Sequence, residues 1–291
     1  MPTMIFPRKT TWFYMICLAL TWCSTAAWGD ELPRHQPTPG GVAVVALPTF
    51  PKTASAFYND RRVLVTNQKD NWIALIGIPL SAKAGKHELE LRQPGRPVQR
   101  IPFTVTHKSY EEQHLTIENK RMVNPQKRDL ERIGKERVRI VKALAQWSER
   151  RDVPLRFDLP VDGVQSSPFG LRRFFNEQPR RPHSGLDIAA PEGTPIRVPA
   201  PGIVIDTGNF YFNGNTVFVD HGQGLVTMYC HMNSIIVTPG KRLPNGAIIG
   251  TVGETGRVTG PHLHWSVSLN NTRVDPSLFL SSSAKLRLKE Y

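Results

Sequence analysis

The stretch HLHWSVSL (residues 262–269) alternates polar and apolar side chains over its whole length. Alternation with a period of two is typical of a β-strand that buries one of its faces. In such a strand His262 and His264 lie side by side on the polar face, while Leu263 points into a core. The Gly260-Pro261 pair directly before it predicts the turn that starts the strand. The stretch therefore predicts a strand that presents two imidazoles together, an arrangement typical of metal sites.

A second stretch, HSGLDIAA (183–190), offers two further ligands. In an extended chain His183 and Asp187 share a face, and Gly185 between them is expected to leave room for a bound ion. Imidazole nitrogen and carboxylate oxygen are common zinc ligands, and a catalytic zinc keeps three protein ligands and a fourth position for water. The alternative interpretation is a scatter of structural histidines, which the two spaced pairs disfavour.

A third stretch, LVTMYCHM (225–232), alternates in the same way. As a strand it is expected to place four side chains on one face, namely Leu225, Thr227, Tyr229 and His231. Cys230 lies in the same stretch, and we interpret it as a buried, inert core residue rather than as a zinc thiolate.

The first 29 residues differ from the rest of the chain. Arg8 and Lys9 precede the short apolar run 11–22, and small residues follow at 24–29. This order is typical of a secretory signal peptide, and the apolar run is too short to cross a bilayer, although a retained N-terminal anchor is the alternative. The protein is therefore expected to be exported, to the periplasm or the cell envelope. Without its signal peptide the chain keeps one cysteine, so no internal disulfide is expected.

The remaining chain divides into four segments. Residues 30–108 hold short apolar runs about ten residues apart, which predicts a small β-sandwich. Residues 109–155 form a connector, in which Asn124 caps an amphipathic helix over 124–152 that packs one apolar stripe. Residues 156–280 return to short strands and Gly/Pro turns, which predicts a second all-β domain, followed by a tail over 281–291. The predicted fold is mainly β.

The chain of 291 residues carries a formal net charge of +13. A basic exported protein is attracted to polyanions, which outside the cytoplasm are cell-wall polymers and anionic lipid headgroups. The sequence shows no aromatic-plus-basic pattern of a nucleic-acid module, so no nucleic-acid partner is expected. Nothing in the sequence indicates an oligomeric state.

These motifs resemble the lysostaphin/LytM-type zinc metallopeptidases, which cut peptide bonds in bacterial peptidoglycan. The family's two signatures, His-x3-Asp and His-x-His, stand here as His183-Ser-Gly-Leu-Asp187 and His262-Leu-His264. The similarity extends over roughly residues 160–278. It includes three further blocks in the family's order, SSPFGLR (166–172), GNTVFVDHGQG (214–224) and MYCHM (228–232).

The resemblance implies one Zn²⁺ per chain, held by His183, Asp187 and His264. It implies that His231 and His262 are the two catalytic histidines. We also name four candidates for the substrate groove: His221, Asn215, Tyr229 and Arg172. For His221, structural support is favoured over direct chemistry.

The function that the resemblance implies is hydrolysis of peptide cross-links between peptidoglycan stem peptides, with D-alanyl cross-links as the expected bond. Glycyl-glycine cleavage is the family's other activity. Two alternatives are a catalytically silent wall-binding or amidase-activating module, which the complete set of five residues disfavours, and an enzyme that its N-terminal β-domain holds inactive.

Overall fold

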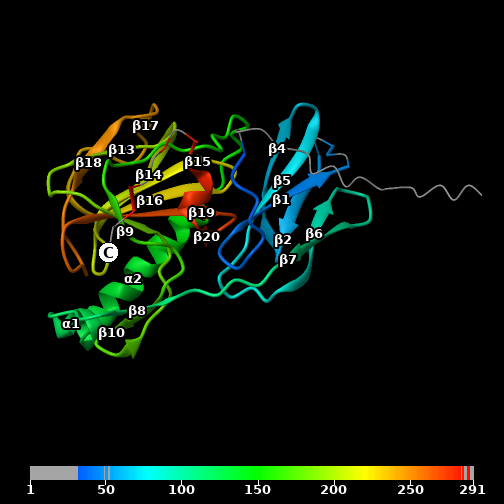
Figure 1. Ribbon diagram of the computed structural model, residues 1–291. Coiled ribbons are helices and arrows are strands. Elements are labelled where there is room, and N and C mark those ends of the chain that lie inside the picture. Colours follow the sequence, from blue (N-terminus) through cyan, green and yellow to red (C-terminus); the bar gives the residue numbers. More distant parts are fainter. Residues whose placement is uncertain (1–31, 49, 52, 283, 285–286, 289–291) are drawn as a thin grey trace, which may run out of the picture.

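The computed structural model describes residues 32–48, 50–51, 53–282, 284 and 287–288. The predicted signal peptide, residues 1–29, lies outside the described residues, as does much of the predicted tail. In Figure 1 two β-rich domains lie side by side, the N-terminal one in blue and cyan and the C-terminal one in green to red. The prediction of a mainly β fold with a helical connector is confirmed.

Two small sheets form the N-terminal domain around one core. The first sheet has the order β1-β5-β4, with β1 at Val42–Leu47, β4 at Leu64–Gln68 and β5 at Asn71–Gly77. The second has the order β3-β2-β6-β7, with β2 at Ser55–Tyr58, β3 at Arg61–Arg62, β6 at Gly85–Arg92 and β7 at Gln99–Val105. Side chains from both sheets, such as Ala43, Ile76 and Leu89, are fully buried in the core between them. This is the small β-sandwich that the spacing of apolar runs predicts.

The connector holds strand β8 (Glu112–Leu115) and helices α1 (Lys120–Val123) and α2 (Lys127–Leu144). The predicted helix over 124–152 is therefore shorter at both ends. Asn124 does not cap it, because the backbone N–H of Asn124 closes α1 by donating to the Lys120 carbonyl. Gln126 is the N-cap of α2, and its backbone N–H donates to Asp129 Oδ2 at 3.0 Å.

The predicted apolar stripe of α2 packs only at the C-terminal end of the helix. Ala143 is buried against the outer face of the large sheet, whereas Leu130 and Val141 are 55% and 50% exposed. A polar contact holds the middle of the helix, where Arg139 Nη2 lies 2.6 Å from Asp206 Oδ1. The expectation of a stripe packed along the helix is wrong for most of its length, because ion pairs replace apolar packing there.

The C-terminal domain is built on an 11-stranded sheet. Its main path runs β17-β14-β15-β16-β19-β12-β9-β21, and β13, β18 and β20 pair beside it. The strands are β9 Val164–Ser167, β12 Leu186–Ala189, β13 Pro195–Arg197, β14 Gly202–Phe210, β15 Gly214–Gly222, β16 Leu225–Ile235, β17 Arg242–Leu243, β18 Ile248–Val252, β19 His262–Leu269, β20 Thr272–Val274 and β21 Arg287–Leu288; the short 3-10 helix η1 is Pro276–Phe279.

The alternating stretch forms β19 with the predicted bounds. Leu263 and Trp265 are fully buried in the main core, and the histidines lie on the opposite face. β19 pairs with β16 on one side and with β12 on the other. β19 therefore lies between the two other stretches that carry predicted site residues, 183–190 and 225–232, which are far apart in sequence.

The two domains share one hydrophobic core. Leu75 of β5 belongs to the same buried cluster as Leu269 and Val274 of the C-terminal domain. The Asn270 side chain also bridges the domains, because it accepts a hydrogen bond from the Gly77 N–H at 2.6 Å and donates one to the Gly77 carbonyl at 3.2 Å. The domains are thus packed together and not merely tethered.

The connector also adds a strand to the C-terminal half. β8 pairs in parallel with β10 (Arg172–Phe175), which pairs in turn with β11 (Gln178–Pro179). In this register Gln113 stands opposite Arg173. Residues from outside the C-terminal domain therefore lie against the segment that leads into HSGLDIAA.

Among the described residues, no helix is both long enough and apolar enough to cross a membrane.

Candidate metal centre

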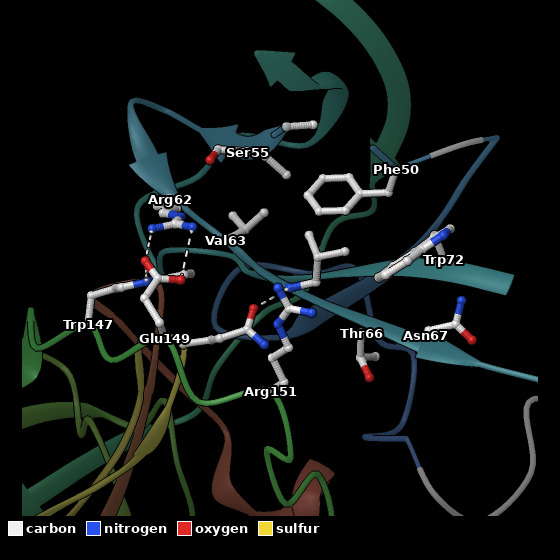
Figure 2. A pocket seen from close by; sticks show the side chains of 14 residues that line it. Phe50, Ser55, Arg62, Val63, Thr66, Asn67, Trp72, Trp147, Glu149 and Arg151 are labelled. Carbon is white, nitrogen blue, oxygen red and sulfur yellow. Dashed lines mark hydrogen bonds and ion pairs between the residues drawn. The ribbon is translucent and has the colours of Figure 1, made fainter. Parts of the chain in front are cut away.

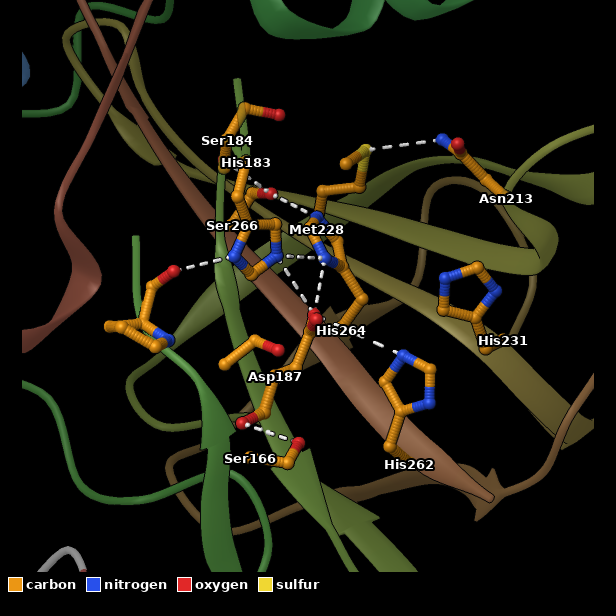
Figure 3. Close-up of polar contacts among 12 residues, drawn as sticks. Ser166, His183, Ser184, Asp187, Asn213, Met228, His231, His262, His264 and Ser266 are labelled. Atoms are coloured by element: carbon orange, nitrogen blue, oxygen red, sulfur yellow. Dashed lines mark hydrogen bonds and ion pairs between the residues drawn. The ribbon is translucent and has the colours of Figure 1, made fainter. Parts of the chain in front are cut away.

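Three side chains point one ligand atom each at a common position, as Figure 3 shows. His183 Nε2 lies 2.9 Å from Asp187 Oδ1 and 3.0 Å from His264 Nδ1. His264 Nδ1 lies 2.7 Å from Asp187 Oδ1. His183 and Asp187 are buried, and His264 is nearly so. The structure thus brings together the three predicted zinc ligands.

Strand pairing places these ligands. Asp187 of β12 stands opposite His264 of β19 in the antiparallel register, and His183 lies just before β12. A Cβ at Gly185 would lie 2.6 Å from His264 Nε2 and 2.6 Å from the Trp265 carbonyl oxygen. Gly185 therefore leaves room for the His264 ring and its strand, and not for an ion as the sequence suggests.

Neighbouring groups fix which ring nitrogen of each ligand carries its proton. The carbonyl of Pro168 can only accept, so His183 Nδ1 donates to it at 2.6 Å and Nε2 keeps its lone pair. Ser266 Oγ donates to the Ser184 carbonyl at 2.9 Å, so it accepts from His264 Nε2, also at 2.9 Å. His264 Nδ1 then keeps its lone pair too. Such outer contacts orient metal-binding histidines.

The protonation states also suit a metal ion. Burial opposes the charge of Asp187, but His183 and His264 outweigh it and hold the pKa of the Asp187 carboxyl well below its usual range. Burial lowers the pKa of His264 to about 4, so that its ring is neutral at pH 7. Two imidazole nitrogens and one carboxylate oxygen are a donor set that zinc prefers, and the residues present therefore fit that ion.

Two more imidazoles stand beside these ligands. The ring centroids of His231 and His262 lie 4.9 Å apart, and His262 Nε2 lies 3.9 Å from Asp187 Oδ1. His231 Nδ1 donates to the Thr255 carbonyl, and His262 Nδ1 donates to the Gly260 carbonyl, each at 2.8 Å. Both rings therefore keep Nε2 free to exchange a proton. Burial, together with the neighbouring His262 and His264, lowers the pKa of His231 well below its usual value.

His231 reaches this face only because β16 breaks its alternation. Strict alternation would place His231 with Tyr229, whose side chain lies in the main core on the other side of the sheet. His231 instead has a φ of 63°, in the left-handed region that a histidine seldom adopts. Its backbone N–H donates to the Asn213 carbonyl at 2.8 Å, and the pairing of β15 with β16 shifts register nearby. The predicted face for His231 is therefore wrong, although the residue does join the site.

Two of the predicted groove residues are buried away from the site. Tyr229 is fully buried, and its hydroxyl lies 2.9 Å from Thr227 Oγ1. His221 is also fully buried, with Nδ1 bonded to the Pro201 carbonyl and Nε2 bonded to Thr227 Oγ1. Burial lowers the pKa of His221 to about 4. Neither residue lines a groove, and structural support is the role that the contacts of His221 show.

Asn215 and Arg172 also act elsewhere. Asn215 Nδ2 donates to the carbonyls of Met232 and Asn233, and its backbone N–H donates to Thr255 Oγ1 at 2.9 Å. Asn215 thus supports the loop whose Thr255 carbonyl holds His231. Arg172 is exposed and pairs with Glu112.

The neighbouring residue, Arg173, reaches the site through a contact with Asp187 that the sequence patterns do not predict. Arg173 Nη2 donates to Asp187 Oδ2 at 2.6 Å. Successive side chains of a strand point to opposite faces, so only one residue of the Arg172-Arg173 pair can do so. The double arginine was the available signal, but the choice between its two members depends on the register of β10.

We describe two clefts, one beside the loop that follows β18 and one beside the N-terminal domain. One of about 420 Å³ is lined by Gly260, Glu254 and Arg257 on one side and by connector residues such as Asn119 on the other, next to the loop that holds both catalytic candidates. Another of about 310 Å³ lies between the N-terminal domain and residues 147–151. Figure 2 shows it with Phe50, Trp72 and the Arg62–Glu149 ion pair, and it contains none of the five predicted site residues.

Known proteins share these features. The family described as peptidase family M23 matches residues 181–276, and the peptidase family M23 N-terminal domain matches residues 35–108. A Neisseria meningitidis protein named DD-carboxypeptidase/endopeptidase Mpg is 41% identical over 111 residues, which are 38% of this chain and 26% of that protein. A Vibrio cholerae protein named peptidoglycan DD-endopeptidase ShyA is 40% identical over 119 residues, which are 40% of this chain and 28% of that protein. The matched part spans about a quarter of these curated relatives.

A solved structure covers both domains. A Pseudomonas aeruginosa chain described as a peptidase M23 is 44% identical, with a TM-score of 0.71. The match covers 84% of this chain and 95% of that chain. Since the similarity extends over both β-domains and both signatures of the site, this chain belongs to peptidase family M23.

Proposed function

We propose that this protein is a zinc-dependent endopeptidase that hydrolyses peptide cross-links of peptidoglycan outside the cytoplasm. The observation that carries the proposal is the convergence of three bare ligand atoms, with two further imidazoles beside them. Two Vibrio cholerae relatives are named peptidoglycan DD-endopeptidases, which agrees with the proposal. The net charge of +13 favours attraction to anionic wall polymers and membrane surfaces.

His183, Asp187 and His264 would hold one Zn²⁺ through Nε2, Oδ1 and Nδ1. When bound there, zinc supplies Lewis acidity that polarises a peptide carbonyl and makes water a stronger acid. The rings of His183 and His264 need not turn to bind the ion. Their other nitrogens already donate to the Pro168 carbonyl and to Ser266 Oγ.

His231 and His262 would move the protons. A neutral imidazole accepts a proton from the attacking water at Nε2 and later passes it to the leaving amine. While the ring is cationic, the carbonyl that accepts its Nδ1–H stabilises the charge; this is Thr255 for His231 and Gly260 for His262. General acid–base transfer contributes about 10²–10⁴-fold to the rate of such reactions.

The bond that we propose is the D-alanyl cross-link between stem peptides, since the Vibrio cholerae relatives are named peptidoglycan DD-endopeptidases. A catalytically silent binding module is disfavoured, because all five residues are present and gathered. A lid formed by the N-terminal β-domain is disfavoured as well. The N-terminal domain contacts the C-terminal end of β19 and the residues after it, away from His262 and His264. Gly77 bonds to Asn270 there, and Arg61 bonds to Thr272.

Digestion of cross-linked peptidoglycan tests the proposal. Purified sacculi are incubated with the chain 30–291, either stripped of metal or stripped and resupplied with zinc, and the products are read by mass spectrometry. We expect cross-linked dimers to disappear and monomers to appear only with zinc, with new termini at D-alanine. Intact dimers in the zinc-supplied sample would contradict the proposal, and new glycine termini would correct the bond.

A further inference from the structure

The two carboxylate oxygens of Asp187 face different partners. Oδ1 faces the ligand nitrogens, 2.9 Å from His183 Nε2 and 2.7 Å from His264 Nδ1. Oδ2 accepts a hydrogen bond from Arg173 Nη2 at 2.6 Å. The side chains of Asp187 and Arg173 are only 7% and 16% exposed, so water screens this ion pair little. One oxygen is thus left for a metal, and the other is occupied by a guanidinium group.

A second residue holds the guanidinium group in place. Arg173 Nε donates to Gln113 Oε1 at 2.9 Å, and Gln113 Nε2 donates to Ser167 Oγ at 2.9 Å. Ser167 of β9 stands opposite Asp187 in the pairing of β9 with β12. The four side chains therefore form a continuous chain of contacts, and each end of it is anchored on the sheet that carries the ligands.

Gln113 lies outside both of the segments that match a family domain. It lies in β8 of the connector, between the matched segments 35–108 and 181–276. Parallel pairing with β10 sets it opposite Arg173. The preceding pair in the same register, Glu112 and Arg172, is exposed and makes its own ion pair. The strand alternation thus sends one arginine to the site and the other to solvent.

We propose that Arg173 and Gln113 are positioning residues for Asp187, which keep Oδ2 occupied so that the carboxylate presents Oδ1 alone to the metal. This inference rests on the zinc function proposed above. A carboxylate without this restraint can turn both oxygens toward a metal ion and crowd the position that water and substrate need. Charge-assisted hydrogen bonds are strong enough to prevent that rotation, and the loss of such outer partners typically costs about 10–100-fold in metal affinity or activity.

A purely structural role for Arg173, as the counter-ion of a buried carboxylate, makes a different prediction. It predicts that removal of Arg173 lowers the stability of the fold, without any change in how Asp187 binds a metal. The two roles are therefore separated by measurements that do not depend on fold stability. These are the coordination of the bound metal and the coupling between the effects of the Gln113 and Arg173 substitutions.

The test compares Arg173→Ala, Gln113→Ala and the double variant in the chain 30–291. Each is loaded with Co²⁺, whose visible absorption is strong when four-coordinate and weaker at higher coordination. We expect Arg173→Ala to weaken this absorption, and to lower kcat on a cross-linked muropeptide dimer with zinc by about 10–100-fold while KM changes little. Gln113→Ala is expected to act in the same direction with a smaller effect. In the double variant, Gln113→Ala should add nothing, because Gln113 acts through Arg173.

His114→Ala is the matched control, since His114 follows Gln113 on β8, is exposed and stacks on Phe174 at 4.6 Å between ring centroids. It should keep the wild-type spectrum and kcat. A wild-type spectrum and kcat in Arg173→Ala would overturn the inference, and so would losses that multiply in the double variant. If Arg173→Ala does not fold, Gln113→Ala alone decides by the same two readouts. A wild-type chain that neither binds Co²⁺ nor cleaves the dimer would instead refute the proposed function.

Discussion

At the scale of single residues, a hydrogen bond to one ring nitrogen decides which nitrogen of each site histidine stays available. His264 and His183 each give one nitrogen to an outer acceptor and turn the other inward. His231 and His262 have both Nδ1 atoms bonded to backbone carbonyls, which leaves Nε2 as the reactive nitrogen. The proposed ligands differ from the proposed proton carriers in where the remaining nitrogen lies: it is 2.9 Å from Asp187 Oδ1 in His183 and 2.7 Å in His264, but 3.9 Å in His262.

Replacement of either proton carrier should stop turnover without loss of the metal. His231→Ala and His262→Ala are expected to retain about one zinc per chain, while kcat falls by about 10²–10⁴-fold. Elemental analysis of the purified variants and cleavage of muropeptide dimers check this. Near-normal activity in either variant would remove that histidine from the mechanism.

His221 should make the fold sensitive to acid. Its pKa is about 4 in the folded chain and about 6.5 in an unfolded one, so the unfolded state binds the proton first as pH falls. The free energy of unfolding is therefore expected to drop by about 2 kcal/mol on this account between pH 7 and pH 5, and the loss is complete only below the folded pKa.

Urea unfolding at pH 7 and pH 5 measures this loss. His221→Asn has no group that titrates in this range, so its stability should fall by about 2 kcal/mol less than that of the wild type between the two pH values. Equal losses in both proteins would show that His221 is not the group responsible.

At the scale of elements, β19 and β12 build the site by their close approach. Gly185 permits it, since a methyl group there would meet both the His264 ring and the Trp265 backbone. β16 contributes a histidine only where it departs from regular alternation, at a residue with a φ of 63°. Regular pairing places two of the proposed ligands, Asp187 and His264, and one irregularity adds a catalytic candidate.

Gly185→Ala should therefore disrupt zinc binding. The Trp265 carbonyl, 2.6 Å from the added Cβ, is backbone and cannot move without shifting β19. We expect a loss of zinc affinity of at least about tenfold, measured by competition with a chelator. Gly134→Ala in α2 is the control, because nothing lies within 4 Å of its Cβ; it should raise stability by about 1 kcal/mol and leave zinc affinity unchanged. Wild-type zinc affinity in Gly185→Ala would contradict this account of the site.

At the scale of the whole molecule, the N-terminal half supports the catalytic half in two places. β5 shares a core with β19 and β20, and β8 places Gln113 against Arg173. Both contacts bury groups that would otherwise meet water. The arrangement favours a supporting role for the first half of the chain over an inhibitory one.

The isolated fragment 156–291 should therefore be less active and less stable than the chain 30–291. It exposes Leu269 and Val274, which pack against Leu75 in the full chain, and it lacks Gln113. Thermal unfolding and dimer cleavage of both chains, at equal zinc occupancy, measure the difference. A fragment more active than the full chain would instead support inhibition by the N-terminal domain. Gln113→Ala in the full chain shows how much of the loss comes from that one contact.

Much of the fold and of the site followed from local patterns. The bounds of β19 and the pairing of ligands by spacing were predictable, because alternation reflects the geometry of a strand and the burial of one face. The bounds of α2 were not, because asparagine is the more common N-cap residue, whereas here Gln126 begins the helix with Asp129 and Asn124 ends α1. The apolar stripe of α2 was misleading, since ion pairs such as Arg139–Asp206 hold that helix.

The sequence by itself determined which residues can bind a metal and that two of them share a strand face. Only the tertiary structure decided that His231 turns toward them, that Tyr229 and His221 turn away, and that Arg173 rather than Arg172 reaches Asp187. The physical reason is the sequence separation between the residues that interact. Side-chain periodicity is fixed by bonds between neighbouring residues, whereas a register shift, a left-handed residue or a partner such as Gln113 depends on contacts between segments far apart in the chain.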